Sequence, residues 1–225
     1  MKLTTQQIAE IDETLVLNGL IYDDIKLEVT DHIASEIEVK MEESNISFDD
    51  ALYQVLLNWK EQMKPSTSKW IGRNNVAPRI VIDKWESIHR KQSSKILLST
   101  LFITLISILF TRLFNIEKFS EGITIGIRSL YLILWFSIII CRVIIWKSKK
   151  ITITGLIFKN SSLVSIIFLF PLGFGFSPIH FFNDNLTINL LMDFYLILWF
   201  VSSVSSLQLA YKHFQFEKKL SISKQ

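Results

Sequence analysis

The apolar residues of this chain follow two different patterns. In residues 1–64, apolar positions recur every three or four residues between charged ones, which is typical of amphipathic helices. From residue 96 onward, apolar residues form long, nearly continuous runs. Because about 20 apolar residues are needed to cross a bilayer as a helix, this change predicts a small helical domain followed by a membrane domain.

Three helices are predicted in the first part. The first spans about 5–17 and stops before Gly19. The third begins after Ser47, a helix-capping residue, and ends at Pro65. The second spans about 22–43 and carries an apolar stripe at a spacing of four residues, formed by Ile25, Val29, Ile33, Ile37 and Met41.

Four segments are predicted to cross the membrane, at about 96–114, 127–146, 161–176 and 188–211. The third contains Pro171, and we expect a kink or an unwound turn at its outer end. The predicted fold class is therefore all-α: a small N-terminal cytosolic helical domain followed by a four-helix transmembrane bundle.

The hexapeptide YLILWF occurs twice, at Tyr131–Phe136 and at Tyr195–Phe200. An ungapped alignment at this offset of 64 residues has ten identities over 95–136, six of them in the hexapeptide. It predicts a tandem repeat of two-helix hairpins related by an axis along the membrane normal. The alternative is a chance similarity between apolar segments.

Charge divides the chain further. Residues 1–62 have four Lys and fourteen acids, residues 63–95 eight Lys or Arg and two acids, and residues 96–225 twelve and five, so the net charges are −10, +6 and +7. The basic loops alternate with poorer ones, which places both termini in the cytosol. The N-terminus lacks the continuous apolar core of a signal peptide. We expect a location in the bacterial inner membrane.

These features suggest four parts: an acidic domain at 1–64, a basic juxtamembrane collar at 65–95, the membrane domain at 96–211 and a basic cytosolic tail at 212–225. In the collar, two tryptophans lie near basic residues, a composition that suits the lipid headgroup region. The alternative is a soluble helix continuous with the first span. The predicted membrane-interface residues are Trp70, Trp85, Arg90 and Lys91.

The stretch YDDIKLEVTDHIASEIEVKMEE, followed by SFDDALYQVLLNWK, resembles an uncharacterised family of bacterial, flavobacterial-type, multi-span membrane proteins with an N-terminal helical EVTDHIA domain. It is also loosely similar to helical domains of bacterial regulatory membrane proteins. The resemblance covers about 40 residues. It implies no activity and no catalytic residues.

Two groups of polar residues are candidate sites. Glu28, His32 and Glu36 are spaced four apart on one helix, as metal ligands can be, but a single His makes a structural role the favoured interpretation, and no metal or cofactor is expected. Arg128 and Asp193 lie near the outer ends of two spans, one residue apart in the repeat alignment. We expect them to form an intramembrane ion pair; separate contacts with headgroups are the alternative.

The predicted function is that of a regulatory or scaffold membrane protein. Its acidic head binds a protein partner through a face that includes Asp24, Asp31 and Glu36. The alternatives are a small transporter or a transporter subunit and, more remotely, a membrane enzyme. No catalytic pair at membrane depth is evident, so no enzyme activity is expected. The expected partners are the lipid bilayer, a protein at the head and a second copy of the chain; nucleic acid is not expected.

Overall fold

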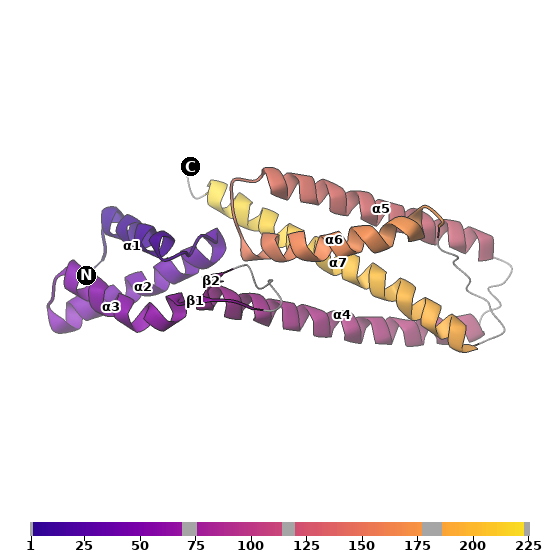
Figure 1. The fold of residues 1–225 in the computed structure, drawn as a ribbon, viewed down its shortest axis with the longest axis horizontal. Coiled ribbons are helices and arrows are strands. Elements are labelled where there is room, and N and C mark those ends of the chain that lie inside the picture. The colour runs from indigo at the N-terminus through magenta and orange to yellow at the C-terminus, as the bar shows by residue number, and fades with distance from the viewer. Residues whose placement is uncertain (1, 69–75, 114–119, 177–185, 223–225) are drawn as a thin grey trace. The chain divides into compact units, whose positions relative to one another are not determined.

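A computed structural model describes residues 2–68, 76–113, 120–176 and 186–222. These residues form helices and one short two-stranded sheet (Figure 1). Four helices are long and apolar enough to cross a membrane, which confirms the all-α fold class and a membrane protein. The elements are α1 (Thr5–Leu17), α2 (Asp23–Ser44), α3 (Phe48–Met63), β1 (Pro65–Ser66), β2 (Ala77–Pro78), α4 (Arg79–Leu113), α5 (Ser120–Lys147), α6 (Ile153–Gly173) and α7 (Leu186–Ile222).

The chain forms two compact units. The N-terminal unit contains Met1–Ile88 together with Lys149–Ile153, the linker between α5 and α6. The membrane unit contains His89–Ser148 and Thr154–Gln225. The linker therefore belongs to the N-terminal unit, although residues 1–88 are far from it in sequence.

Local sequence signals set the helix ends in the N-terminal unit. Thr4 and Gln7 form a reciprocal capping box at the start of α1, and Ser47 accepts a hydrogen bond from the backbone N–H of Asp50 at the start of α3. Gly19 follows α1 with a φ of +87°, a left-handed conformation that glycine adopts without strain. The predicted start and end of the first helix and the predicted start of the third are therefore confirmed to within one residue.

The core of this unit lies where α2 packs against both α1 and α3. Four of the five residues of the predicted stripe on α2 are buried: Ile33 and Ile37 are fully inaccessible, and Ile25 and Val29 nearly so, whereas Met41 is partly exposed. At about 25 cal/mol per Å² of apolar surface removed from water, burial of each such side chain stabilises the folded state by roughly 1.5–3 kcal/mol.

The predicted collar differs in the structure. Helix α4 runs without interruption from Arg79 to Leu113, which matches the alternative of a helix continuous with the first span. Trp85 is only 2% exposed and packs in the core of the N-terminal unit, so its ring does not face lipid headgroups. Arg90 and Lys91 are exposed. Trp70 lies outside the described residues.

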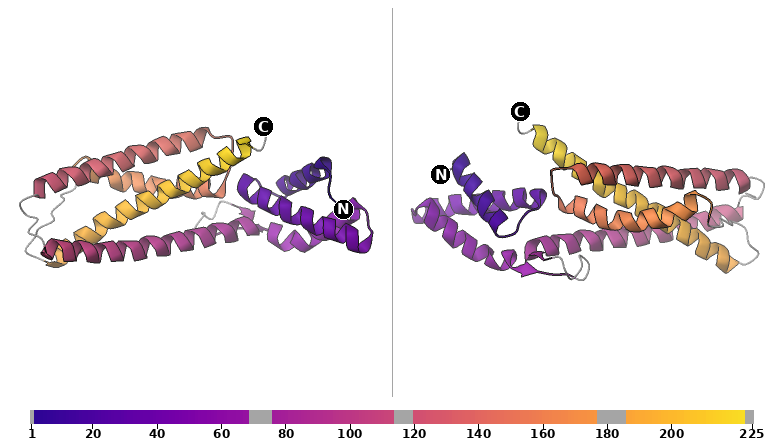
Figure 2. Two further views of the ribbon diagram at one scale, coloured as in Figure 1. Left: turned by 180° about the vertical axis from the view of Figure 1, so that it is seen from behind. Right: turned by 45° about the horizontal axis from the view of Figure 1, so that its top comes forward.

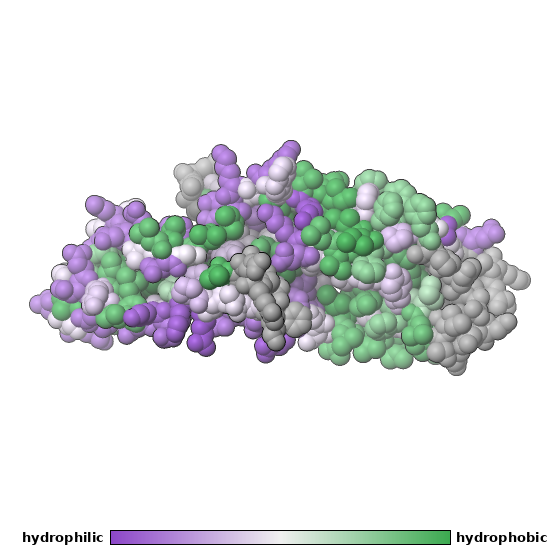
Figure 3. Space-filling model, viewed as in Figure 1, coloured by the Kyte–Doolittle hydropathy of each residue, from purple (hydrophilic) through white to green (hydrophobic). Residues whose placement is uncertain are grey.

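In the membrane unit, α5, α6 and α7 lie side by side (Figure 2). Their outward faces are apolar, as expected for helices that contact lipid, and hydrophobic residues cover this part of the surface (Figure 3). Helix α6 begins at Ile153, eight residues before the predicted start, and continues through Pro171 to Gly173. Helix α7 reaches Ile222, so most of the predicted tail is helical.

The two YLILWF copies occupy different environments. The first copy buries Tyr131 and Leu134, whereas the second buries Leu196. Both tryptophans contact α6, but Trp135 donates a hydrogen bond to the Ile166 carbonyl oxygen, and Trp199 stacks on Phe168 at a centroid distance of 4.0 Å. The copies thus share a sequence and a neighbouring helix, but not the same contacts. The tandem repeat stays a prediction.

Candidate functional sites

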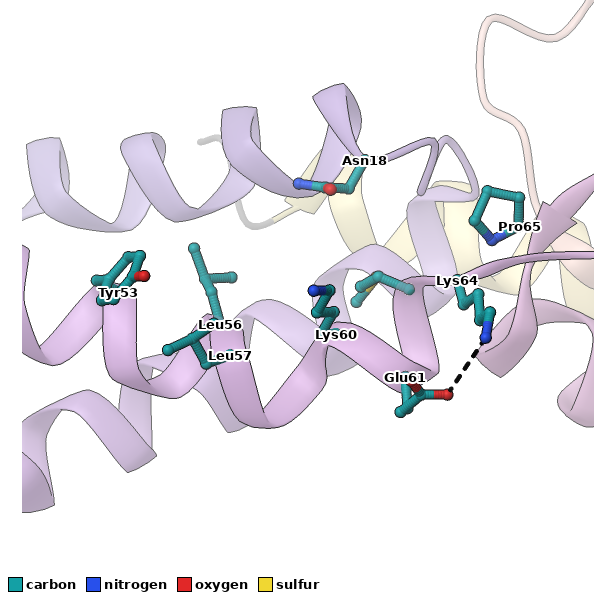
Figure 4. Close-up of a pocket in the computed structure, with 9 residues that line it drawn as sticks. Asn18, Tyr53, Leu56, Leu57, Lys60, Glu61, Lys64 and Pro65 are labelled. Carbon is teal, nitrogen blue, oxygen red and sulfur yellow. Dashed lines mark ion pairs between the residues drawn. The ribbon is translucent and has the colours of Figure 1, made fainter.

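A groove of about 540 Å³ runs along α3 in the N-terminal unit (Figure 4). Tyr53 and Leu57 lie on its α3 side and are 67% and 50% exposed. Such exposed apolar side chains are typical of interaction surfaces when they gather in one depression. The lining residues are Asn18, Tyr53, Leu56, Leu57, Lys60, Glu61, Met63, Lys64 and Pro65.

The periodicity of α3 explains this groove. Ala51 and Val55 are fully buried on the face toward the core. Tyr53, Leu57 and Lys60 recur at i, i+4 and i+7 on another face, where no core residue covers them. The sequence carried this signal, because Tyr53 and Leu57 are apolar residues that do not share the helix face of Ala51 and Val55.

Charges at the end of the groove favour an acidic occupant. Lys60, Glu61 and Lys64 line this end. Among the ion pairs of the described residues, Glu61 pairs with Lys64 at 4.0 Å and not with Lys60. Both members of that pair are largely exposed, so the pair is weak. The local net charge of the rim is therefore positive, in an N-terminal region that is acidic as a whole.

A second site joins the first turn of α2 to the linker. The Asp23 carboxylate accepts hydrogen bonds from the Ile151 N–H at 3.0 Å and from the Lys150 ammonium at 3.4 Å. In return, the Asp23 N–H donates to the Ile151 carbonyl oxygen at 2.7 Å. We call these interactions, together with the one made by Asp24, the α2–linker contact.

Asp24 caps the start of α6 from outside the helix. Both of its carboxylate oxygens lie 3.1 Å from the Ile153 backbone nitrogen, one of the N–H groups that a helix leaves without an internal partner. Burial raises the pKa of the Asp24 carboxyl above its ordinary value of 3.8, while hydrogen bonds from the Ile153 and Ile25 N–H groups oppose that shift. The carboxyl is thus held in a site that favours its neutral form.

The three predicted metal candidates have separate neighbours. Glu28 pairs with Lys84 at 3.0 Å, and the Trp59 indole N–H donates to Glu36 at 3.1 Å. His32 is exposed. Within the described ranges, no three His, Cys, Asp or Glu side chains are placed to hold a metal ion.

The predicted interaction face is also divided. Asp24 accepts a hydrogen bond from the Ile153 N–H and Glu36 accepts one from the Trp59 indole, whereas Asp31 is exposed on α2. The role of these three residues in partner binding stays a prediction. The groove beside α3 is a surface that sequence reasoning did not identify.

In the membrane unit, polar side chains gather on one face of α4. Thr100, Thr104 and Ser107 recur at i, i+4 and i+7, and the two threonine hydroxyls are buried without a hydrogen-bond partner among the described residues. Ser107 donates to the Asp193 carboxylate on α7 at 3.3 Å. We call these four residues the polar seam. The spacing of Thr100, Thr104 and Ser107 can be seen in the sequence. The sequence does not show that this face of the first span is the buried one.

Arg128 and Asp193 are not joined in the structure. Among the ion pairs of the described residues none links them, and Asp193 bonds to Ser107 instead. Arg128 lies beside Gly175, where an added Cβ would come within 3.2 Å of its guanidinium. The absence of a side chain at Gly175 leaves that space to Arg128.

No protein-family model matches this chain, and neither does any curated protein or solved structure.

Proposed function

We propose that this chain is a regulatory membrane protein whose N-terminal unit binds a protein partner in the groove beside α3. The groove carries the proposal. It combines a concave surface of about 540 Å³ with two large apolar side chains, Tyr53 and Leu57, that are at least half exposed. Tyrosine in a depression is a frequent anchor in protein interfaces.

The shape and charge of the groove define the partner. An amphipathic helix would place apolar residues one turn apart against Tyr53 and Leu57, which are themselves one turn apart on α3. An acidic residue at its end would face Lys60 and Lys64. The partner segment is therefore apolar along one face and acidic at one end, rather than basic as the net charge of the region alone suggests.

The α2–linker contact gives this binding a regulatory route. The linker is the covalent connection between α5 and α6, and Asp24 caps the first residue of α6. Because α2 packs against α3, a partner that displaces α3 also disturbs α2 and its hydrogen bonds to the linker. Partner binding would in this way change the restraint on two membrane helices.

Site-specific photo-crosslinking in intact cells tests the groove. A photoreactive residue is placed at Tyr53, Leu57 or Lys60 in the full chain, and at Gln54 and Gln62 on other faces of α3 as controls. We expect one adduct of constant mass from the three groove positions and none from the controls. In addition, Leu57→Glu should abolish the adduct at Tyr53, because it places a charge in the apolar part of the groove.

Two results would contradict the proposal. Equal adducts at the groove and control positions would mean that the groove has no specific occupant. An adduct of twice the chain's own 26.2 kDa would identify a second copy of the chain and exclude a different partner.

Transport is a second candidate function, and the polar seam favours it. A carboxylate within a predicted span, bonded to Ser107 and near buried hydroxyls on α4, is costly in lipid and typical of ion or proton pathways. Packing between helices is the simpler explanation of such hydroxyls. Proton or Na⁺ flux into liposomes that contain the full chain, compared with its Asp193→Asn variant, distinguishes them: a flux that this variant abolishes supports transport.

A further inference from the structure

A second cavity lies in the membrane unit, near the ends of α5 and α6 that adjoin the linker. It has a volume of about 400 Å³, within the range of roughly 300–1,000 Å³ that is usual for small-molecule sites. Four residues line it: Arg142, Val143 and Trp146 from α5, and Lys159 from α6. Two of the four are cationic and none is acidic.

Arg142 is held in a fixed position in this cavity. One guanidinium nitrogen, Nη1, donates to the Ser162 hydroxyl at 2.7 Å and also to the Lys159 carbonyl oxygen. These bonds use one of the three nitrogens and leave the other N–H groups of the fork for a ligand. The Lys159 ammonium makes no ion pair with an acid in the part of the chain that the structure describes.

Both cations lie at a similar depth. Arg142 is five residues before the end of α5, and Lys159 is six residues after the start of α6. At 1.5 Å per residue, they lie about 7.5 and 9 Å from the helix ends next to the linker. This is the level at which basic side chains reach from a span to the lipid headgroups. Trp146, 74% exposed, has the amphipathic ring that is common at the same level.

Apolar side chains continue from the cavity toward the middle of the spans. Val143 is 44% exposed in the wall. Leu163 and Ile167 follow Lys159 at one-turn intervals on α6 and are 48% and 65% exposed. A ligand with a charged end between Arg142 and Lys159 could therefore lay an acyl chain along α6.

We infer that this cavity binds the phosphate group of an anionic phospholipid. Arg142 and Lys159 contact the phosphate oxygens, Trp146 lies beside the headgroup, and the acyl chains cover Leu163 and Ile167. Arginine is suited to this role because its planar fork can donate two hydrogen bonds to one phosphate. Basic pockets between membrane helices are known sites for such headgroups. The inference does not depend on the groove beside α3.

Lipid-dependent stabilisation of the full chain in a neutral detergent tests the site. The probes are phosphatidylglycerol, phosphatidylcholine with the same acyl chains, and inorganic phosphate. We expect phosphatidylglycerol alone to raise the midpoint of thermal unfolding. Lys159→Gln should weaken its apparent affinity about fivefold, since one basic residue near an anionic headgroup contributes on the order of 1 kcal/mol.

The variants separate binding from folding. Arg142→Gln should also lose the response, but it removes hydrogen bonds within the protein, so Lys159→Gln is the decisive variant. Lys147→Gln removes a charge from the end of α5 outside the cavity and should respond as the wild type does. Equal responses of Lys159→Gln and Lys147→Gln, or of the two lipids, would overturn the inference. An equal response to inorganic phosphate would show a soluble phosphate ligand and would overturn the assignment to a lipid.

Discussion

The Tyr131 hydroxyl donates a hydrogen bond of 2.7 Å to the carbonyl oxygen of Leu196. The bond joins the first residue of one YLILWF copy to the second residue of the other, and thereby connects α5 to α7. Tyr131 is 3% exposed, so the bond is shielded from water and lipid.

Removing this hydroxyl should destabilise the membrane unit. Tyr131→Phe keeps the ring and loses the bond, which typically costs about 1 kcal/mol, or somewhat less between membrane helices. Tyr195→Phe is the matched control, because Tyr195 begins the other copy and has no described hydrogen bond of this kind. Thermal unfolding of the full chain in detergent should show a lower midpoint for Tyr131→Phe alone. Equal midpoints for both variants would mean that the bond contributes nothing measurable.

Asp193 should be coupled to Ser107 rather than to Arg128. A double-mutant cycle with Ser107→Ala and Asp193→Asn should give a coupling free energy of roughly 0.6 kcal/mol, and at most about 1.7 kcal/mol, as for other hydrogen bonds between membrane helices. The same cycle with Arg128→Met in place of Ser107→Ala should give none. Coupling only in the Arg128 cycle would restore the ion pair predicted from the sequence.

Asp24 should make the stability of the N-terminal unit depend on pH. Its pKa is raised by burial, so the folded state binds a proton more tightly than the unfolded state does. The contribution is fully present below the ordinary pKa of 3.8 and is lost as the pH rises through the higher folded pKa. Asp24→Asn retains an oxygen that can accept from Ile153 without an ionisable group, and should remove this pH dependence.

The measurement is the unfolding midpoint of the full chain from pH 3.8 upward. Wild type should lose stability relative to Asp24→Asn across this window, and the difference should be constant at higher pH. Asp31→Asn, on the exposed side of α2, serves as the control and should follow the wild type. Parallel curves for all three proteins would show that Asp24 is not held in the site described above.

Ile33→Asp should unfold the N-terminal unit. Ile33 is fully buried on α2, and an unpaired charge at that position costs several kcal/mol or more. Hydrogen exchange of the full chain should show loss of amide protection across α1, α2 and α3, while α5 and α7 remain protected. Val39→Asp, at a position on the same helix that is 51% exposed, should leave the protection unchanged.

The topology predicted from charge stays a prediction that reporter fusions can test. Fusions at Asn115 and Asn183 should be outside, and a fusion at Gln225 inside, because the basic loops alternate with loops that are poor in Lys and Arg. An outside position for Gln225 would show that the spans do not number four or that their orientation is reversed.

The sequence by itself determined the elements whose signals are local. The cap at Ser47, the stop at Gly19 and the four-residue spacing of Ile25 to Ile37 act through backbone hydrogen bonds and one helix face, so they could be read from neighbouring residues. The apolar runs predicted four spans for the same reason, since length and hydropathy suffice.

Only the tertiary structure decided which faces meet. Trp85 has the same neighbours in sequence whether its ring is in lipid or in a protein core; the structure places it in the core. The α2–linker contact joins Asp24 to Ile153, 129 residues away, through a backbone N–H that carries no signal in the sequence. The cavity of Arg142 and Lys159 likewise depends on the packing of α5 against α6. Contacts between distant segments depend on their packing in three dimensions, and the periodicity of a single helix does not specify its partner.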